Sequence, residues 1–150
     1  MTSRLSSLRL AAALALAAGL ATAAHADDSA ALAAAAKDPG ASVASSGLVY
    51  KSLKEGTGAS PKATDTVKVN YKGMLVDGTK FDASADHGGP ITFPLNRVIP
   101  CWTEGVQKMK VGGHAKLTCP SAIAYGPRGA GGVIPPNATL VFEVELIAIN

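Results

Sequence analysis

All seven aromatic residues of this 150-residue chain lie beyond residue 47, which confines any substantial hydrophobic core to the remainder of the sequence. They are Tyr50, Tyr71, Phe81, Phe93, Trp102, Tyr125 and Phe142. The first 46 residues contain 18 alanines and few bulky side chains. The segment of about 100 residues that follows can bury one modest core, so the sequence excludes large multidomain enzymes.

The N-terminus has the pattern of an export signal. Arg4 and Arg9 come before an apolar stretch over residues 10–20. Residues 24–26 (Ala-His-Ala) then match the small-x-small pattern at which signal peptidases cleave. The apolar stretch is shorter than the ~20 residues that a transmembrane helix needs. We therefore predict that residues 1–26 are a cleaved signal peptide and that the mature protein is not held in a membrane. A bacterial periplasm is the expected location, with secretion as the alternative.

Residues 27–47 have no aromatic side chain, and Leu32 and Val43 are their only sizeable apolar groups. Burial of so few apolar groups cannot offset the conformational entropy lost on ordering the segment. We expect a flexible Ala-rich tether here, with at most a helical turn or two before Pro39. The folded domain is then expected to span residues 48–150.

Charge and motifs exclude several classes of function. Without residues 1–26 the chain has twelve basic and eleven acidic residues, a formal charge of +1, which argues against a nucleic-acid partner. His87, His114 and the two cysteines are not spaced as zinc ligands. The glycine-rich residues 126–132 do not form a phosphate-binding motif, and no Gly-x-Ser-x-Gly elbow is present. The sequence therefore predicts no metal and no cofactor.

Alternation of apolar and polar residues predicts strands in the C-terminal segment. In the clearest case, Val67, Val69 and Tyr71 face inward while the intervening lysines face water. Asp77-Gly78 is a hairpin-turn dipeptide, so the chain should fold back there. The expected strands are residues 66–76, 80–83, 91–95, 115–119 and 139–149.

Only residues 100–109 have a helical pattern. Pro100 suits a first helical turn, and Trp102, Val106 and Met109 fall on one face of a helix. One short helix packed on one twisted antiparallel sheet gives an α+β domain.

The only two cysteines are Cys101 and Cys119. In an oxidising compartment an even pair favours a disulfide, which would tie the start of the helix to the end of a strand. Closing that loop is worth on the order of 3 kcal/mol. The alternative is two small buried thiols that pack. A catalytic redox pair is disfavoured because no Cys-x-x-Cys motif is present.

Four sequence blocks carry a resemblance to a known family. The blocks are VNYKGMLVDGTKFDAS (69–84), VIPCWTEG (98–105), AYG (124–126) and VIPPNATLVFEVEL (133–146). In this order they resemble the signature of the FKBP-type peptidyl-prolyl cis/trans isomerases, and most of all that of small exported bacterial members. The resemblance covers residues 47–150. It implies a five- to six-stranded antiparallel sheet wrapped around one short helix, with a pocket between the two.

The resemblance also assigns roles to residues. Trp102 matches the indole at the pocket floor, and residues 126–134 match a flap over the pocket mouth. Tyr125 matches a tyrosine whose hydroxyl reaches a substrate carbonyl, while the backbone N–H of Ile99 matches a second carbonyl donor. The residues in catalytic positions are Tyr71, Phe81, Asp82, Tyr125 and Phe142. Those in substrate-binding positions are Ile91, Val98, Ile99, Trp102, Val133 and Ile134.

Four features depart from the family's pattern. Asn96 and Arg97 stand in a connection that is shortened just before Val98, at the pocket rim. Ile91 stands where archetypal small members have an aromatic residue, which predicts a thinner pocket wall. Ala130 replaces a bulkier flap residue. Cys101 replaces a glycine before the tryptophan, in agreement with a bridge to Cys119.

The function that the resemblance implies is acceleration of Xaa-Pro bond rotation in exported proteins. The alternative is a chaperone or binding module that holds proline-containing segments in the same pocket with little turnover. The expected partners are unfolded or partly folded proline-containing polypeptides, together with macrolide inhibitors of the tacrolimus and rapamycin type. Because no long N-terminal dimerisation helix is recognisable, a monomer is expected.

Overall fold

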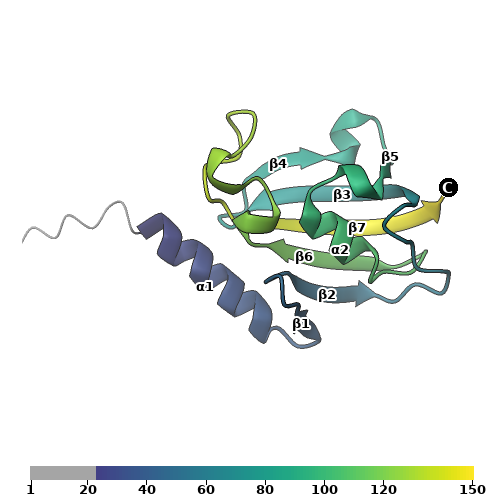
Figure 1. Cartoon of the computed structure of the whole chain (residues 1–150), viewed down its shortest axis with the longest axis horizontal. Coiled ribbons are helices and arrows are strands. Elements are labelled where there is room, and N and C mark those ends of the chain that lie inside the picture. Colours follow the sequence, from purple (N-terminus) through teal and green to yellow (C-terminus); the bar gives the residue numbers. More distant parts are fainter. Residues whose placement is uncertain (1–22) are drawn as a thin grey trace, which may run out of the picture.

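The computed structural model describes residues 23–150 (Figure 1). Most of the predicted signal peptide therefore lies outside the described residues. The predicted cleavage site after Ala26 falls within the first helix, α1 (Ala23–Lys37). No helix in the described part of the chain is long and apolar enough to cross a membrane.

The domain is built on one antiparallel sheet. Its strands are β1 (Ala41–Val43), β2 (Val49–Lys54), β3 (Thr66–Leu75), β4 (Lys80–Ala83), β5 (Ile91–Pro94), β6 (His114–Cys119) and β7 (Leu140–Ile149). The order along the sheet is β1-β2-β6-β7-β3-β4, and β5 pairs with the first half of β3. The α+β fold predicted from the sequence is confirmed, with β1 and β2 in addition to the five strands expected.

The two long strands β3 and β7 lie side by side at the centre of the sheet. Val67 and Val69 of β3 are fully buried, as their alternation with lysines predicts. On β7 the residues that face the core are Leu140, Phe142, Val144 and Leu146, all at most 4% exposed. The period of two therefore sets one face of both strands against the core.

The helix α2 (Pro100–Val106) lies across the sheet in front of its central strands (Figure 1). It ends three residues before the predicted boundary, although Met109 is still buried. Gly105 permits its close approach to β6, because a Cβ there would lie 2.8 Å from the Leu117 side chain. A disulfide between Cys101 and Cys119, with a Cα–Cα distance of 5.8 Å, joins α2 to the end of β6.

The segment expected to be a flexible tether contains regular structure, which corrects that expectation. Residues 23–37 form α1, which ends before Pro39 as predicted, and β1 pairs with β2 through Ser42 opposite Tyr50. The carboxylate of Asp28 also accepts a hydrogen bond from the backbone N–H of Thr139, at 3.0 Å. Apolar content did not predict this order. The strand β1 is held by backbone pairing with β2, and the Asp28 carboxylate is held by the backbone N–H of Thr139.

Four short 3₁₀ turns connect the main elements. They are η1 (Ser84–His87), η2 (Leu95–Arg97), η3 (Ser121–Ile123) and η4 (Gly126–Arg128). The turns η1 and η2 follow β4 and β5, and η2 leads directly into α2. The connections between the sheet and α2 therefore bring several chain segments to the same end of the helix.

Candidate active site

A cavity of about 460 Å³ opens between α2 and the sheet. Six of the seven aromatic residues line it. The complete lining is Tyr71, Phe81, Asp82, Phe93, Arg97, Val98, Ile99, Trp102, Tyr125 and Phe142. The aromatic residue left out is Tyr50, whose hydroxyl lies 3.5 Å from the carbonyl oxygen of Lys108. Residues from strands, turns and the helix thus converge on one largely apolar hollow.

Trp102 is the central ring of this cluster and is only 4% exposed. Its indole meets Tyr71, Phe93 and Phe142 at centroid distances of 5.2, 5.7 and 5.4 Å. The three interplanar angles are 82°, 84° and 86°, the edge-to-face geometry that aromatic quadrupoles favour. The indole N–H is buried without a hydrogen-bond partner among the described residues. The floor of the cavity is therefore a fixed apolar surface.

A glycine near the C-terminal end of β3 makes room for the second wall. Phe81 and Phe142 meet edge to face, with centroids 5.6 Å apart. A Cβ on Gly73 would lie 2.6 Å from the ring of Phe81 and 2.9 Å from that of Phe142. Any other residue at this position would displace one of the two rings. A glycine that weakens the strand is thus what allows the wall to form.

Asp82 supplies the only carboxylate of the cavity lining. The Tyr71 hydroxyl donates to it at 2.6 Å, and the backbone N–H of Ala83 donates to it at 2.9 Å. The His87 Nε2 lies 2.8 Å from the same carboxylate. Partial burial by itself would raise the pKa of Asp82, but the hydrogen bonds from Tyr71 and His87 outweigh it, so this pKa lies below its usual value. The carboxylate is therefore ionised and held in place.

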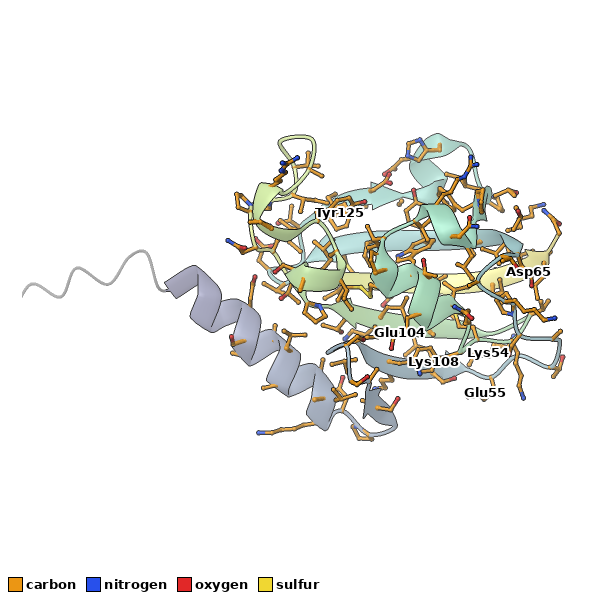
Figure 2. The ribbon with its side chains drawn as sticks, in the orientation of Figure 1. Lys54, Glu55, Asp65, Glu104, Lys108 and Tyr125 are labelled. Atoms are coloured by element: carbon orange, nitrogen blue, oxygen red, sulfur yellow. A yellow bond between two sulfur atoms is a disulfide. The ribbon has the colours of Figure 1, made fainter. Side chains whose placement is uncertain are left out.

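The two tyrosines of the cavity differ in their partners. The Tyr71 hydroxyl is committed to Asp82, and burial together with that hydrogen bond raises its pKa far above the usual value. Tyr125 is 40% exposed, and its hydroxyl makes no hydrogen bond within the described part of the chain. Burial and the nearby Asp82 charge raise the pKa of Tyr125. It is thus a neutral hydroxyl with a free donor at the cavity wall, beside the loop that contains η4 (Figure 2).

Val98 and Ile99 lie between η2 and α2, and both line the cavity. The carbonyl oxygen of Ile99 accepts hydrogen bonds from the backbone N–H groups of Trp102 and Thr103, which start the helix. Its own N–H has no acceptor among the described residues. This is a second free donor at the cavity, at the position that the sequence predicted for one.

Three residues predicted to bind substrate do not line the cavity. Ile91 lies on β5 opposite Val69, and its place in the wall is taken by Phe93, two residues further along the same strand face. In the predicted flap, Ile134 is 7% exposed and packs in the core, whereas Val133 is 56% exposed. The backbone groups of Ala130 and Ile134 form two hydrogen bonds of 3.0 Å. The loop is therefore pinned through its buried isoleucine.

The sequence analysis did not place Phe93 and Arg97 in the site. The period of two from Ile91 to Phe93 was a signal that could have found the first, because residues i and i+2 of a strand share a face. The sequence placed Arg97 only in a shortened connection at the pocket rim, and no pattern gave its side chain a role. Within residues 28–150, no group of three potential metal ligands lies close enough together to hold an ion.

Comparison with known proteins places this geometry in a family. The sequence pattern of the family described as "FKBP-type peptidyl-prolyl cis-trans isomerase" matches residues 58–147. This chain belongs to that family.

Several relatives match over most of the chain. FkpA of Aeromonas hydrophila, an FKBP-type peptidyl-prolyl cis-trans isomerase, is 63% identical over 119 residues, which are 79% of this chain and 44% of the relative. FkpA of Escherichia coli strain K12 is 52% identical over 115 residues, which are 77% of this chain and 42% of the relative. The chain thus spans less than half the length of these two proteins.

Solved structures give the same result. The crystal structure of FkpA from Escherichia coli matches with a TM-score of 0.82 and 46% identity, over 85% of this chain and 59% of that one. The crystal structure of a peptidyl-prolyl cis-trans isomerase from Pseudomonas syringae pv. tomato matches with a TM-score of 0.79 and 40% identity. That match covers 85% of this chain and 94% of the other.

Proposed function

We propose that the cavity binds a proline and its neighbouring residues and accelerates rotation about the Xaa-Pro bond. The observation that carries the proposal is the convergence of six aromatic residues on one open cavity of about 460 Å³. Membership of the isomerase family supports the same reaction. The substrates are proline-containing segments of unfolded or partly folded exported proteins.

The reaction needs no nucleophile and no leaving group. Rotation about an Xaa-Pro bond has a barrier of about 20 kcal/mol because amide resonance is lost when the bond twists. A twisted amide is less dipolar than a planar one, so removal from water destabilises the planar ground state more. A wall of Phe81, Phe142 and Trp102 around the prolyl ring provides this environment. The domain therefore accelerates the reaction by favouring the twisted form.

Two free donors orient the substrate in this proposal. The Tyr125 hydroxyl and the Ile99 N–H bind the carbonyl groups that flank the rotating bond. Neither group has a partner within the described chain, so binding a carbonyl breaks no internal hydrogen bond. Fixing the substrate on both sides restricts motion to the bond that must rotate.

Asp82 has a positioning role in this account. Its carboxylate holds the Tyr71 hydroxyl at 2.6 Å and thereby fixes the Tyr71 ring against Trp102. The charge also lies at the edge of the cavity.

The cellular setting follows from the N-terminal sequence. Residues 1–26 act as a cleaved signal peptide, and the mature chain, starting at Asp27, works as a monomer in the periplasm. The aromatic cavity is also suited to macrolide inhibitors of the tacrolimus and rapamycin type, with affinity limited by Ala130 on the flap.

The test is a proline-peptide isomerisation assay on residues 27–150. Wild-type protein at micromolar concentration should accelerate the cis-to-trans reaction, Tyr125→Phe should reduce kcat/KM, and Phe81→Ala should abolish most of the acceleration. Tyr50→Phe is the matched control, because Tyr50 lies outside the cavity. Binding of the peptide without acceleration would instead identify a chaperone or binding module.

A further inference from the structure

Arg97 is the only cationic side chain among the cavity-lining residues. It is exposed, and no carboxylate lies within ion-pair distance of it in the part of the chain that the structure describes. The rest of the lining is apolar apart from Asp82 and the tyrosine hydroxyls. One unpaired positive charge therefore stands at the edge of an aromatic hollow.

The backbone that carries Arg97 is held firmly. Arg97 is the last residue of η2, whose first residue, Leu95, is fully buried. The Leu95 N–H donates to the backbone carbonyl of Asp65 at 2.9 Å, and the Thr103 hydroxyl donates to the Leu95 carbonyl at 2.7 Å. These contacts tie η2 to the chain before β3 and to α2. The guanidinium thus extends from a fixed point, which reduces the entropy lost when it binds a ligand.

The single carboxylate of the lining is already engaged. Asp82 accepts hydrogen bonds from the Tyr71 hydroxyl and the Ala83 N–H and lies against His87. Arg97 therefore has no competing carboxylate among residues 23–150, and an anion brought in by a substrate would meet a free guanidinium. The anionic side chains of a polypeptide substrate are the carboxylates of aspartate and glutamate. A guanidinium can bind a carboxylate through two parallel hydrogen bonds.

We propose that Arg97 is a specificity-determining residue that makes the cavity accept an aspartate or glutamate directly beside the proline more readily than the uncharged amide of the same size. This inference rests on the proposed isomerase function, because it concerns which prolines the cavity accepts. The ion pair is solvent-exposed, and such pairs change affinity by roughly two- to fivefold. The selection is therefore a bias among clients and not an absolute requirement.

The experiment uses two series of proline peptides that differ only in the residue beside the proline. In one series glutamate, glutamine or leucine precedes the proline, and in the other it follows the proline. The measured quantity is the ratio of kcat/KM for glutamate to that for glutamine. For the wild-type protein, this ratio should be about two to five in at least one series. The ratio should fall toward one at high salt.

Variants of Arg97 test whether this residue causes the preference for glutamate over glutamine. Arg97→Gln should abolish it, Arg97→Lys should keep part of it, and Arg97→Glu should reverse it, with the kcat/KM of each variant for the leucine peptide used to normalise its values for glutamate and glutamine. Arg128→Gln is the matched control, since Arg128 is also exposed and also ends a 3₁₀ turn but does not line the cavity. A glutamate-to-glutamine ratio that is the same in wild type and Arg97→Gln in both series would overturn the proposal. Failure to turn over the leucine peptides would instead contradict the isomerase function.

Discussion

The hydroxyl of Tyr71 donates a 2.6 Å hydrogen bond to the carboxylate of Asp82, and this contact joins the aromatic floor of the cavity to its charged edge. The Tyr71 ring lies 5.2 Å from Trp102, so the hydrogen bond orients a ring that packs on the cavity floor. The Tyr71 hydroxyl proton is committed to Asp82 and is therefore not available to a substrate.

The first prediction concerns the ionisation of Asp82. Tyr71→Phe removes one of the hydrogen bonds that lower the Asp82 pKa, so this pKa should rise in the variant. Carbon-13 NMR titration of the Asp82 carboxyl group through acidic pH measures the change directly. Tyr50→Phe, which does not touch the carboxylate, should leave the titration unchanged; an unaltered midpoint in Tyr71→Phe would show that the hydrogen bond does not set this pKa.

The sign of the pH effect on stability follows from the same shift. The pKa of Asp82 in the folded protein lies below the usual aspartate value of 3.8. The contribution of its ionised form is therefore complete above that value and is lost as the pH falls through the folded-state pKa. Acid unfolding should begin at a higher pH in Tyr71→Phe than in wild type, as followed by tryptophan fluorescence. Coincident acid transitions would contradict this coupling.

The third prediction tests the role of Gly73 in shaping the wall. Gly73→Ala places a methyl group against the rings of Phe81 and Phe142, which should cost about 1–3 kcal/mol of unfolding free energy. The displaced ring should also lower kcat/KM by about tenfold or more, equivalent to about 1.4 kcal/mol.

A double-mutant cycle separates this steric effect from a general loss of strand stability. Phe81→Leu removes the ring atoms that the new methyl group would meet, so the two substitutions should be less destabilising together than their sum. Urea unfolding of the four proteins gives the coupling energy. Simple additivity would mean that the clash is relieved elsewhere.

The fourth prediction concerns the disulfide. Cys101 and Cys119 are both fully buried, and their bridge closes a loop with a sequence separation of 18 residues. Replacing both residues by alanine should lower the unfolding free energy by about 3 kcal/mol. Denaturant unfolding measures this loss, and thiol counting in the denatured, unreduced wild-type protein should find no free thiol. A double variant as stable as wild type would show that the bridge adds nothing to the packing of α2.

Alternation predicted the parts of the fold that depend on the core. Val67, Val69 and the inward residues of β7 are buried as expected, because a period of two places them on one face. The sequence could not predict β1, since its order comes from backbone pairing with β2 and not from apolar side chains. Local pattern also could not give the exact end of α2, which depends on how the chain turns toward β6.

The candidate site was predictable where the resemblance to the isomerase family assigned a position to a residue. Tyr71, Phe81, Asp82, Val98, Ile99, Trp102, Tyr125 and Phe142 were all expected at the cavity and all line it. Ile91, Val133 and Ile134 do not, because which residue of a face reaches a cavity depends on the curvature of β5 and the folding of the flap. The sequence placed Arg97 only in a shortened connection at the pocket rim, since the contact of its side chain with the cavity depends on the way η2 packs against α2.

The most direct test of the central claim is exchange NMR on a proline peptide with a small amount of residues 27–150. Cross-peaks between the cis and trans forms should appear with wild-type protein and disappear with folded Phe81→Ala, because the aromatic wall is then incomplete. Cross-peaks of equal strength in both proteins would contradict the claim that this cavity is the site of catalysis.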